Sequence, residues 1–389
     1  MLENIKGNKI LHLIIKTLLK ESKYLSLFRY SKLFKKLLNI SLDDYKIYSC
    51  IEIHLIPKKE LKNGENYFIN INSNNLLKSH KKPSYHIYFD EDKKEINREY
   101  ITKEDKVNKI KIIIEGEEKS FRGLFTFCDC IQEISFTNFK RENITDMREM
   151  FAFCKSMTKI DLINFKTNNV TNMSQMFRSC LSLKEIDMSN LITSKLTHMN
   201  DMFSGCCSLK KINMSKIDTS NVINMNNIFN SCSSLEYIDL STLNTSNVLD
   251  MGFMFFNCSS LKEIIFPEKI NTSKVNNMSL MFSGCVNLLK LNVINFDTSQ
   301  VTNMYRMFSG CAGLKELNVE NFVTLKVKDM RFMFSKCKSL IELNVGKFHI
   351  DKKCCFRWMF SETSEELKNK IREQNDKITN LAFEDYLIE

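Results

Sequence analysis

One feature constrains this chain more than any other: a box of the form Met-Phe-x-x-Cys, or a close variant, returns along most of its length. The phenylalanine of the box recurs every 26 residues, with a single step of 27. These anchor phenylalanines are Phe125, Phe151, Phe177, Phe203, Phe229, Phe255, Phe282, Phe308, Phe334 and Phe360. A fixed period in this range is typical of units that bury their apolar faces only against their neighbours. The sequence therefore predicts a solenoid rather than several globular domains.

The apolar residues inside one repeat predict how each coil folds. A methionine lies four residues before the anchor phenylalanine and a cysteine three residues after it, which places all three on one face of a helix. Farther along, Leu183, Ile186 and Met188 follow the inward pattern of a short strand. We expect each coil to contain a strand, a turn and a short helix. Residues 119–360 would then form about nine to ten coils, with a parallel sheet on one side and short helices on the other.

Nine of the 14 cysteines occupy one position of the repeat, which bears on both their role and the compartment. They are Cys128, Cys154, Cys180, Cys206, Cys232, Cys258, Cys285, Cys311 and Cys337. Equivalent side chains of stacked coils point the same way, and nine residues cannot pair evenly. We therefore expect free thiols that pack as small buried apolar groups. Free thiols are typical of a reducing compartment, so the predicted location is cytoplasmic.

The N-terminal part of the chain differs from the repeats in charge and in period. Residues 1–48 show a helical apolar pattern, and residues 1–36 contain nine Lys/Arg and two acids, a net charge of 9 − 2 = +7. A small helical bundle, a partner-binding helical module and a helix on an anionic membrane surface all remain open for this basic segment. Residues 49–118 alternate apolar and polar side chains, which predicts a small β-rich region that packs on the first repeat.

The C-terminal residues 361–389 follow the last box and predict a helical cap, because a serine and several acids begin an apolar helical pattern. Terminal repeats of an array are often atypical, since the last core surface would otherwise face water. We expect Trp358, the single tryptophan, to close the end of the core.

The repeat resembles a known family. The strand pattern of Leu183, Ile186 and Met188, together with segments such as Asp297-Thr-Ser-Gln-Val-Thr-Asn-Met-Tyr-Arg-Met-Phe-Ser-Gly-Cys311, resembles the BspA-like branch of the leucine-rich repeats over residues 121–360. One departure is that asparagine follows the first leucine by seven positions rather than eight. The resemblance implies a leucine-rich repeat array that binds other proteins.

Residue patterns for chemistry are missing from the sequence. The six histidines are scattered, and there is no Cys-x-x-Cys pair, phosphate-binding glycine loop or nucleophile motif. We therefore expect no enzyme activity, no cofactor and no metal site. Outside residues 1–36 the net charge is close to neutral, which disfavours nucleic acid as a partner. There is no secretory signal and no run of about 18 apolar residues, so no transmembrane span is expected.

The outward residues of the predicted sheet point to a candidate contact site. Two residues after each repeat's first strand leucine, or its equivalent, lies one column: Glu133, Lys159, Glu185, Lys211, Tyr237, Glu263, Lys290, Glu316 and Glu342. Opposite charges on neighbouring strands would hold the register. Near the 27-residue step, Tyr237, Ile265 and Leu289 interrupt this charged face, and an apolar patch in a polar face is typical of protein contacts. The predicted rim of the patch consists of Lys262, Glu263 and Lys290. Alternatively, the extra residue beside Pro267 could let the turn fold over the patch.

The function that these observations favour is non-enzymatic: protein–protein interaction or scaffolding through the repeat surface, with an unidentified protein partner. Two alternatives stay open. In the first, residues 9–48 form an F-box-like module that binds an adaptor, and the chain is a substrate receptor of a ubiquitin ligase, although no Leu-Pro start is visible. In the second, the chain is a cell-surface adhesin of the BspA-like type, for which the sequence shows no export signal.

Overall fold

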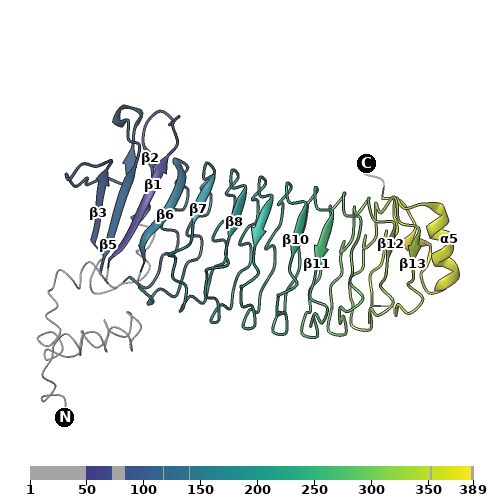
Figure 1. Ribbon diagram of the computed structural model, residues 1–389. Coiled ribbons are helices and arrows are strands. Elements are labelled where there is room, and N and C mark those ends of the chain that lie inside the picture. Colours follow the sequence, from purple (N-terminus) through teal and green to yellow (C-terminus); the bar gives the residue numbers. More distant parts are fainter. Residues whose placement is uncertain (1–49, 72–83, 117, 140, 351–352, 387–389) are drawn as a thin grey trace, which may run out of the picture.

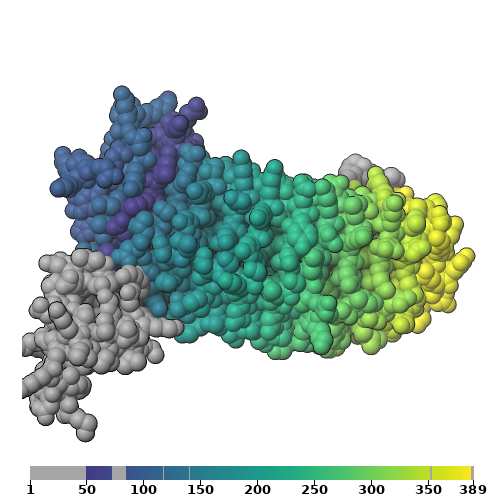
Figure 2. Space-filling view, viewed as in Figure 1, coloured from purple at the N-terminus to yellow at the C-terminus, as the bar shows by residue number. Residues whose placement is uncertain are grey.

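The computed structural model describes residues 50–71, 84–116, 118–139, 141–350 and 353–386. The predicted helical segment 1–48 lies outside these residues. Successive repeats stack side by side in one long row, with a β-rich region at its beginning and helix α5 (Glu365–Gln374) at its end (Figure 1). In the space-filling view the β-rich region projects beyond one edge of this elongated body (Figure 2).

Short parallel strands follow one another along the row. They are β6 (Ile131–Phe139), β7 (Lys159–Asp161), β8 (Glu185–Asp187), β9 (Lys211–Asn213), β10 (Tyr237–Asp239), β11 (Glu263–Ile265), β12 (Glu316–Leu317) and β13 (Glu342–Leu343). Pairing is in register at the repeat period, so Glu133 lies beside Lys159 and Glu185 beside Lys211. The coil between β11 and β12 joins through an isolated parallel bridge from Glu263 to Lys290.

The β-rich region extends the sheet of the first coils. Its elements are β1 (Ile51–Pro57), β2 (Asn66–Tyr67), β3 (Ser84–Phe89), β4 (Tyr100–Ile101), the 3-10 helix η2 (Lys103–Asp105) and β5 (Ile110–Glu115). One five-stranded sheet has the order β3-β5-β1-β6-β7, in which β1 pairs antiparallel with β6. The apolar alternation of Ile51, Ile53 and Leu55 faces the core, as all three are fully buried. The domain boundaries themselves remain predictions.

The predicted short helices of the array are wrong. Among the residues described in 118–350 there is no α-helix, and each box folds as two successive turns. In one copy, the Met176 N–H donates to the Met173 carbonyl and the Cys180 N–H donates to the Phe177 carbonyl, both at 3.2 Å. Gln175, within the first turn, has a φ of 59°, which is left-handed and ends any α-helical run.

Neighbouring coils explain why turns replace helices. Every second amide of the box donates across to the next coil: Met173 to His198, Gln175 to Asn200, and Phe177 to Met202, at 2.9–3.0 Å. A helix would use these N–H groups within itself and leave the neighbouring carbonyls unpaired. Both conformations point the methionine, phenylalanine and cysteine inward, so the spacing of apolar residues fits either one.

The anchor phenylalanines form a continuous stack through the row. Neighbouring ring centroids lie 5.4–5.9 Å apart, with interplanar angles of 3–18°. The stack ends on Phe383, which follows the 3-10 helix η3 (Asn380–Ala382) and is 6% exposed. The expectation that Trp358 closes the core is therefore wrong. Trp358 has a φ of 57°, is half-buried and stacks on Phe332 instead.

The repeated thiols do more than fill space. Apart from Cys128, the thiol of each of the nine cysteines lies 3.0–3.3 Å from the carbonyl oxygen of the preceding coil's anchor phenylalanine, to which it donates a hydrogen bond. Burial raises the pKa of these thiols, to about 12 for Cys206, Cys258 and Cys337. The thiol therefore acts as a buried donor that stays protonated, a role that the description as a small apolar group leaves out.

Buried threonines join the coils on a third side. They recur at the repeat period as Thr167, Thr193, Thr219, Thr245, Thr272, Thr298 and Thr324, all at most 2% exposed. Each hydroxyl donates to a carbonyl of the next coil at 2.6–3.2 Å. Thr219 also accepts a hydrogen bond, so that both the N–H and the carbonyl of Asn244 depend on one hydroxyl. Without the hydroxyl, both backbone groups would lose their partner in the neighbouring coil.

Replacing Thr219 by valine is expected to lower the free energy of unfolding by about 1–3 kcal/mol, because valine keeps the volume but leaves the Asn244 backbone without its partner. Urea unfolding followed by circular dichroism measures the loss. The control is Thr219→Ser, which keeps the hydroxyl and should be less destabilised than the valine variant. If valine were as stable as the wild type, the hydroxyl ladder would have no part in joining the coils.

Candidate functional site

The structure places the predicted contact residues on the exposed face of the strands. Tyr237 begins β10 and lies beside Glu263 of β11, while Asp239 lies beside Ile265. The next coil follows with Lys290 beside Glu263. The predicted residues thus lie on three adjacent coils at neighbouring strand positions: Ile265 stands two residues after the column of Tyr237, and Leu289 one residue before it.

The apolar members of this patch are open to solvent. Tyr237, Ile265 and Leu289 are 47%, 38% and 59% exposed. The longer turn after β11 does not cover them, since Phe266 turns inward and packs against Phe255, Phe282 and Phe296. The inserted residue is taken up outside the core, where the Ile270 N–H donates to the Pro267 carbonyl. An apolar patch therefore lies at the middle of a face that is otherwise charged.

The charged rim is held by weak surface contacts. The Lys262 ammonium lies 2.7 Å from the Glu236 carboxylate, and this contact holds the pKa of Glu236 below its usual value. Both side chains are more than half exposed, so the pair is screened by water and salt and contributes little to stability. The side chains of the rim are free to rearrange when a partner approaches.

Two charged hollows lie on the same face, one on each side of the patch. The first, of about 690 Å³, is lined by Lys159, Lys184, Glu185, Asp187 and Lys211, among others. The second, of about 670 Å³, is lined by Lys290, Glu316, Glu320, Glu342 and Lys370, among others. Sequence reasoning did not find these hollows, since they depend on the shape of the sheet and on α5. Together with the patch they make one long surface of mixed charge.

A second cluster that the sequence did not reveal lies on the side of the turns. The Arg306 guanidinium lies 4.6 Å from the ring centre of Phe332, which stacks on Trp358 at 5.0 Å, and Arg357 lies 5.2 Å from the Trp358 ring. Among the described residues, the buried Nε of Arg306 has no hydrogen-bond partner. The available signal was the presence of bulky residues where other coils have Glu, Gln, Asp or Asn in the left-handed conformation.

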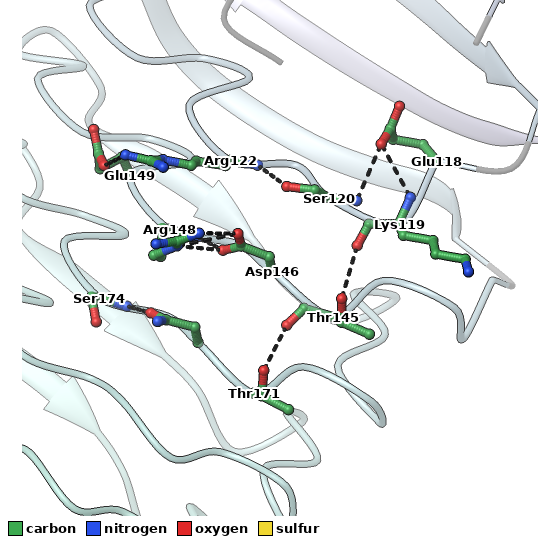
Figure 3. A network of polar contacts seen from close by, with 11 residues as sticks. Glu118, Lys119, Ser120, Arg122, Thr145, Asp146, Arg148, Glu149, Thr171 and Ser174 are labelled. Atoms are coloured by element: carbon green, nitrogen blue, oxygen red, sulfur yellow. Dashed lines mark hydrogen bonds and ion pairs between the residues drawn. The ribbon is translucent and has the colours of Figure 1, made fainter. Parts of the chain in front are cut away.

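A ladder of short polar side chains begins each box. In seven coils the Oδ1 of an Asp or Asn accepts the N–H two residues later; these residues are Asp146, Asn172, Asn224, Asp250, Asn277, Asn303 and Asp329. Figure 3 shows the first rungs, where Thr171 donates to the Thr145 carbonyl and Thr145 to that of Lys119. This ladder positions the turns and explains the Asn- and Thr-rich sequence before each box.

Within the described residues, no group of three or more His, Cys, Asp or Glu could hold a metal ion. The same part of the chain contains no helix long and apolar enough to cross a membrane. The expectations of no enzyme activity and no cofactor remain predictions.

Comparison with known proteins identifies the repeats. Residues 119–213, 182–266 and 262–373 match the family described as "Mycoplasma protein of unknown function, DUF285". The chain belongs to this family. Because the three matches overlap and together span 119–373, the DUF285 pattern covers the whole row of coils and α5. No curated protein matches.

Two solved structures resemble this DUF285 chain to a small degree. The leucine-rich repeat protein of T. pallidum (TpLRR) is 19% identical, with 62% of this chain and 88% of that chain covered and a TM-score of 0.27. TLR13 from a complex with ssRNA13 is 18% identical, with 57% of this chain and 33% of that chain covered and a TM-score of 0.24.

Proposed function

We propose that this DUF285 member is a BspA-like leucine-rich repeat protein that binds another protein through the exposed face of its strands and catalyses no reaction. The observation that carries the proposal is the apolar patch of Tyr237, Ile265 and Leu289 in the middle of a charged face. The repeat period and the in-register parallel pairing support the leucine-rich repeat assignment.

The patch has the composition of a contact surface. Tyrosine offers a large ring with a polar end and is frequent among the residues that dominate binding energy. Here Tyr237 is half exposed and lies beside Glu263, which Lys262 precedes in the chain and which Lys290 of the following coil adjoins. A partner that covers the ring would exclude water from an apolar centre while the rim charges set its orientation.

Replacing both Tyr237 and Leu289 by serine is expected to weaken partner binding at least tenfold, since each substitution removes apolar area from the centre of the contact. The measurement is a quantitative pull-down from native extract with the wild type and the double variant. Ile163→Ser combined with Leu325→Ser is the matched control, because these residues are 63% and 64% exposed and lie outside the patch. An unchanged partner list for the Tyr237/Leu289 variant would contradict the proposal.

The proposed location is a reducing compartment such as the cytoplasm. What supports it is that the repeated thiols are buried and hydrogen-bonded to carbonyl oxygens, an arrangement that needs the reduced form. Counting thiols on protein that has been unfolded without reductant tests this part. Oxidation of most of the nine repeat cysteines would instead favour the adhesin alternative. Co-purification of an adaptor that depends on residues 1–48 would favour the ubiquitin-ligase alternative.

A further inference from the structure

Along the charged column of the strand face, glutamate and lysine alternate, and this alternation changes phase at the centre of the row. Over nine coils the column contains Glu133, Lys159, Glu185, Lys211, Tyr237, Glu263, Lys290, Glu316 and Glu342. When the coils are numbered from Glu133, glutamate stands in the first and third coils and lysine in the second and fourth. The sixth coil, directly after Tyr237, contains glutamate again. Unbroken alternation would place lysine where Glu263 stands. Tyr237 is in the fifth of the nine coils, so the change of phase coincides with the middle of the row.

This change of phase makes the face complementary to itself. If a second copy is turned by 180° about an axis along β10, the order of its coils is reversed while each column meets the same column. Lys211 then faces Glu263 of the second copy, Glu185 faces its Lys290, and Lys159 faces its Glu316. Each of these contacts occurs twice by symmetry, and only Glu133 and Glu342 at the ends are alike in charge. Without the change of phase, every one of these contacts would join like charges.

We propose that the strand face binds a second copy of this chain in this reversed arrangement, with the two-fold axis passing beside Tyr237. The inference rests on the proposed use of the strand face for protein binding and names the partner. A two-fold interface requires one surface to be complementary to itself, which the column satisfies. Tyr237, 47% exposed, would meet its own counterpart at the axis and supply the apolar centre.

Away from the axis, the neighbouring columns of the strand face fit the same arrangement. Two residues after the charged column, Asp187 would face Asn292 of the second copy and Asp161 would face its Asn318, so carboxylates meet amide groups that can donate. One residue before the column, the exposed Leu289 would meet the aliphatic part of Lys184.

Like charges also meet near the axis, because each residue of the central coil faces its own counterpart there: Glu236 faces Glu236 and Asp239 faces Asp239. In the reversed arrangement Lys210 faces Lys262 of the second copy. Glu236 lies between the two positions in the same column, forms an ion pair with Lys262 at 2.7 Å and also interacts with Lys210 of its own chain. The two Glu236 carboxylates thus lie among four lysines, and each kind of charge offsets part of the repulsion within the other.

The other face-to-face arrangement is disfavoured by the same charges. A rotation about the long axis of the row would place each coil opposite its own counterpart, so that Lys211 would face Lys211 and Glu263 would face Glu263. In the view of Figure 1 the row runs nearly straight, as a contact along its length requires.

The size of the face predicts a weak dimer. Nine coils about 4.8 Å apart, each exposing about four residues, give a face of about 43 by 13 Å. This projected area of about 560 Å² is below the roughly 800 Å² that each partner contributes to a standard interface. We expect a dissociation constant of about micromolar or weaker that rises with salt, because the contacts are exposed charges.

Sedimentation velocity of the full chain, over a concentration series that spans the micromolar range, tests the arrangement. Lys211→Glu and Glu263→Lys are each expected to weaken self-association at least tenfold, since both copies of a contact become like-charged. An equal mixture of the two variants is expected to regain dimers, because every contact between a Lys211→Glu chain and a Glu263→Lys chain is again of opposite charge. Lys338→Glu, an exposed lysine outside the strand face, controls for the change in net charge.

Three results would overturn the inference: a wild-type chain that stays monomeric throughout the series, a Lys211→Glu variant that associates as well as the wild type, or a mixture that stays monomeric. Because restoration by mixing needs both variants to be folded, it also excludes loss of structure as the cause. If the wild type is monomeric but the Tyr237/Leu289 variant still loses a partner from extract, the dimer is excluded and the proposed protein-binding function of the strand face stands. If the wild type is a dimer and the Tyr237/Leu289 variant keeps every partner from extract, the strand face serves self-association and not the binding of another protein.

Discussion

Replacing Phe229 by alanine is expected to lower the free energy of unfolding by about 3–5 kcal/mol. The ring is fully buried and lies between Phe203 and Phe255, at centroid distances of 5.9 and 5.5 Å. Neighbouring coils stack at a spacing fixed by their hydrogen bonds, so the rings on either side cannot move in to fill the cavity. Guanidinium unfolding followed by circular dichroism measures the loss.

The matched control is Phe383→Ala at the end of the same stack. Phe383 is 6% exposed and, unlike Phe229, has one anchor ring beside it, that of Phe360. Interactions in a row of repeats are limited to nearest neighbours, so damage at the end can be confined to local opening there, whereas damage in the middle separates the row into two halves. Phe383→Ala should therefore cost less, and equal losses would contradict a row that is held together only by neighbouring coils.

The stacking of the coils could be predicted because one number, the period of 26 residues, determines it. The same spacing that returns the anchor phenylalanine also returns Glu133, Lys159 and Glu185 to one strand position. Their register follows without knowledge of the backbone: β6 pairs with β7 through Glu133 and Lys159, and β8 pairs with β9 through Glu185 and Lys211. The exposure of Tyr237 and Leu289 could be predicted on the same grounds, since the residues between inward positions must face outward.

The conformation of the box could not be predicted from the same period. Met173, Phe177 and Cys180 face inward in a helix and in paired turns alike. The choice depends on where the backbone N–H groups find acceptors, and the carbonyls of the next coil supply them. A left-handed residue such as Gln175 gives no clear sequence signal, because glutamine is also a good helix former.

The hydrogen bonds of small side chains could not be predicted from the sequence for a related reason. Thr219 and the repeated cysteines have a sequence pattern that fits simple packing, and their roles as donors depend on carbonyl positions in the adjacent coil. The change of phase at Tyr237 is visible in the sequence, but its meaning depends on the in-register pairing that places Tyr237 beside Glu263.

Raising the pH from about 8.5 to 10.5 is expected to unfold the row of coils in the presence of reductant. Burial raises the pKa of the repeated thiols, to about 12 for Cys206 and Cys258, whereas a thiol in an unfolded chain has a pKa of about 8.5. Below pH 8.5 both states keep the proton, so stability does not depend on these groups. Above it the unfolded chain releases protons that the folded chain retains, and stability falls by about 1.4 kcal/mol per pH unit for each thiol.

Urea unfolding at a series of pH values measures this slope. Cys258→Ser removes one buried thiol, and its slope should be smaller by about 1.4 kcal/mol per pH unit, or one proton. Cys207→Ser is the control for the substitution itself, because Cys207 is exposed in the folded chain. Stability that stays constant from pH 8.5 to 10.5 would mean that the thiols are not buried in the folded protein.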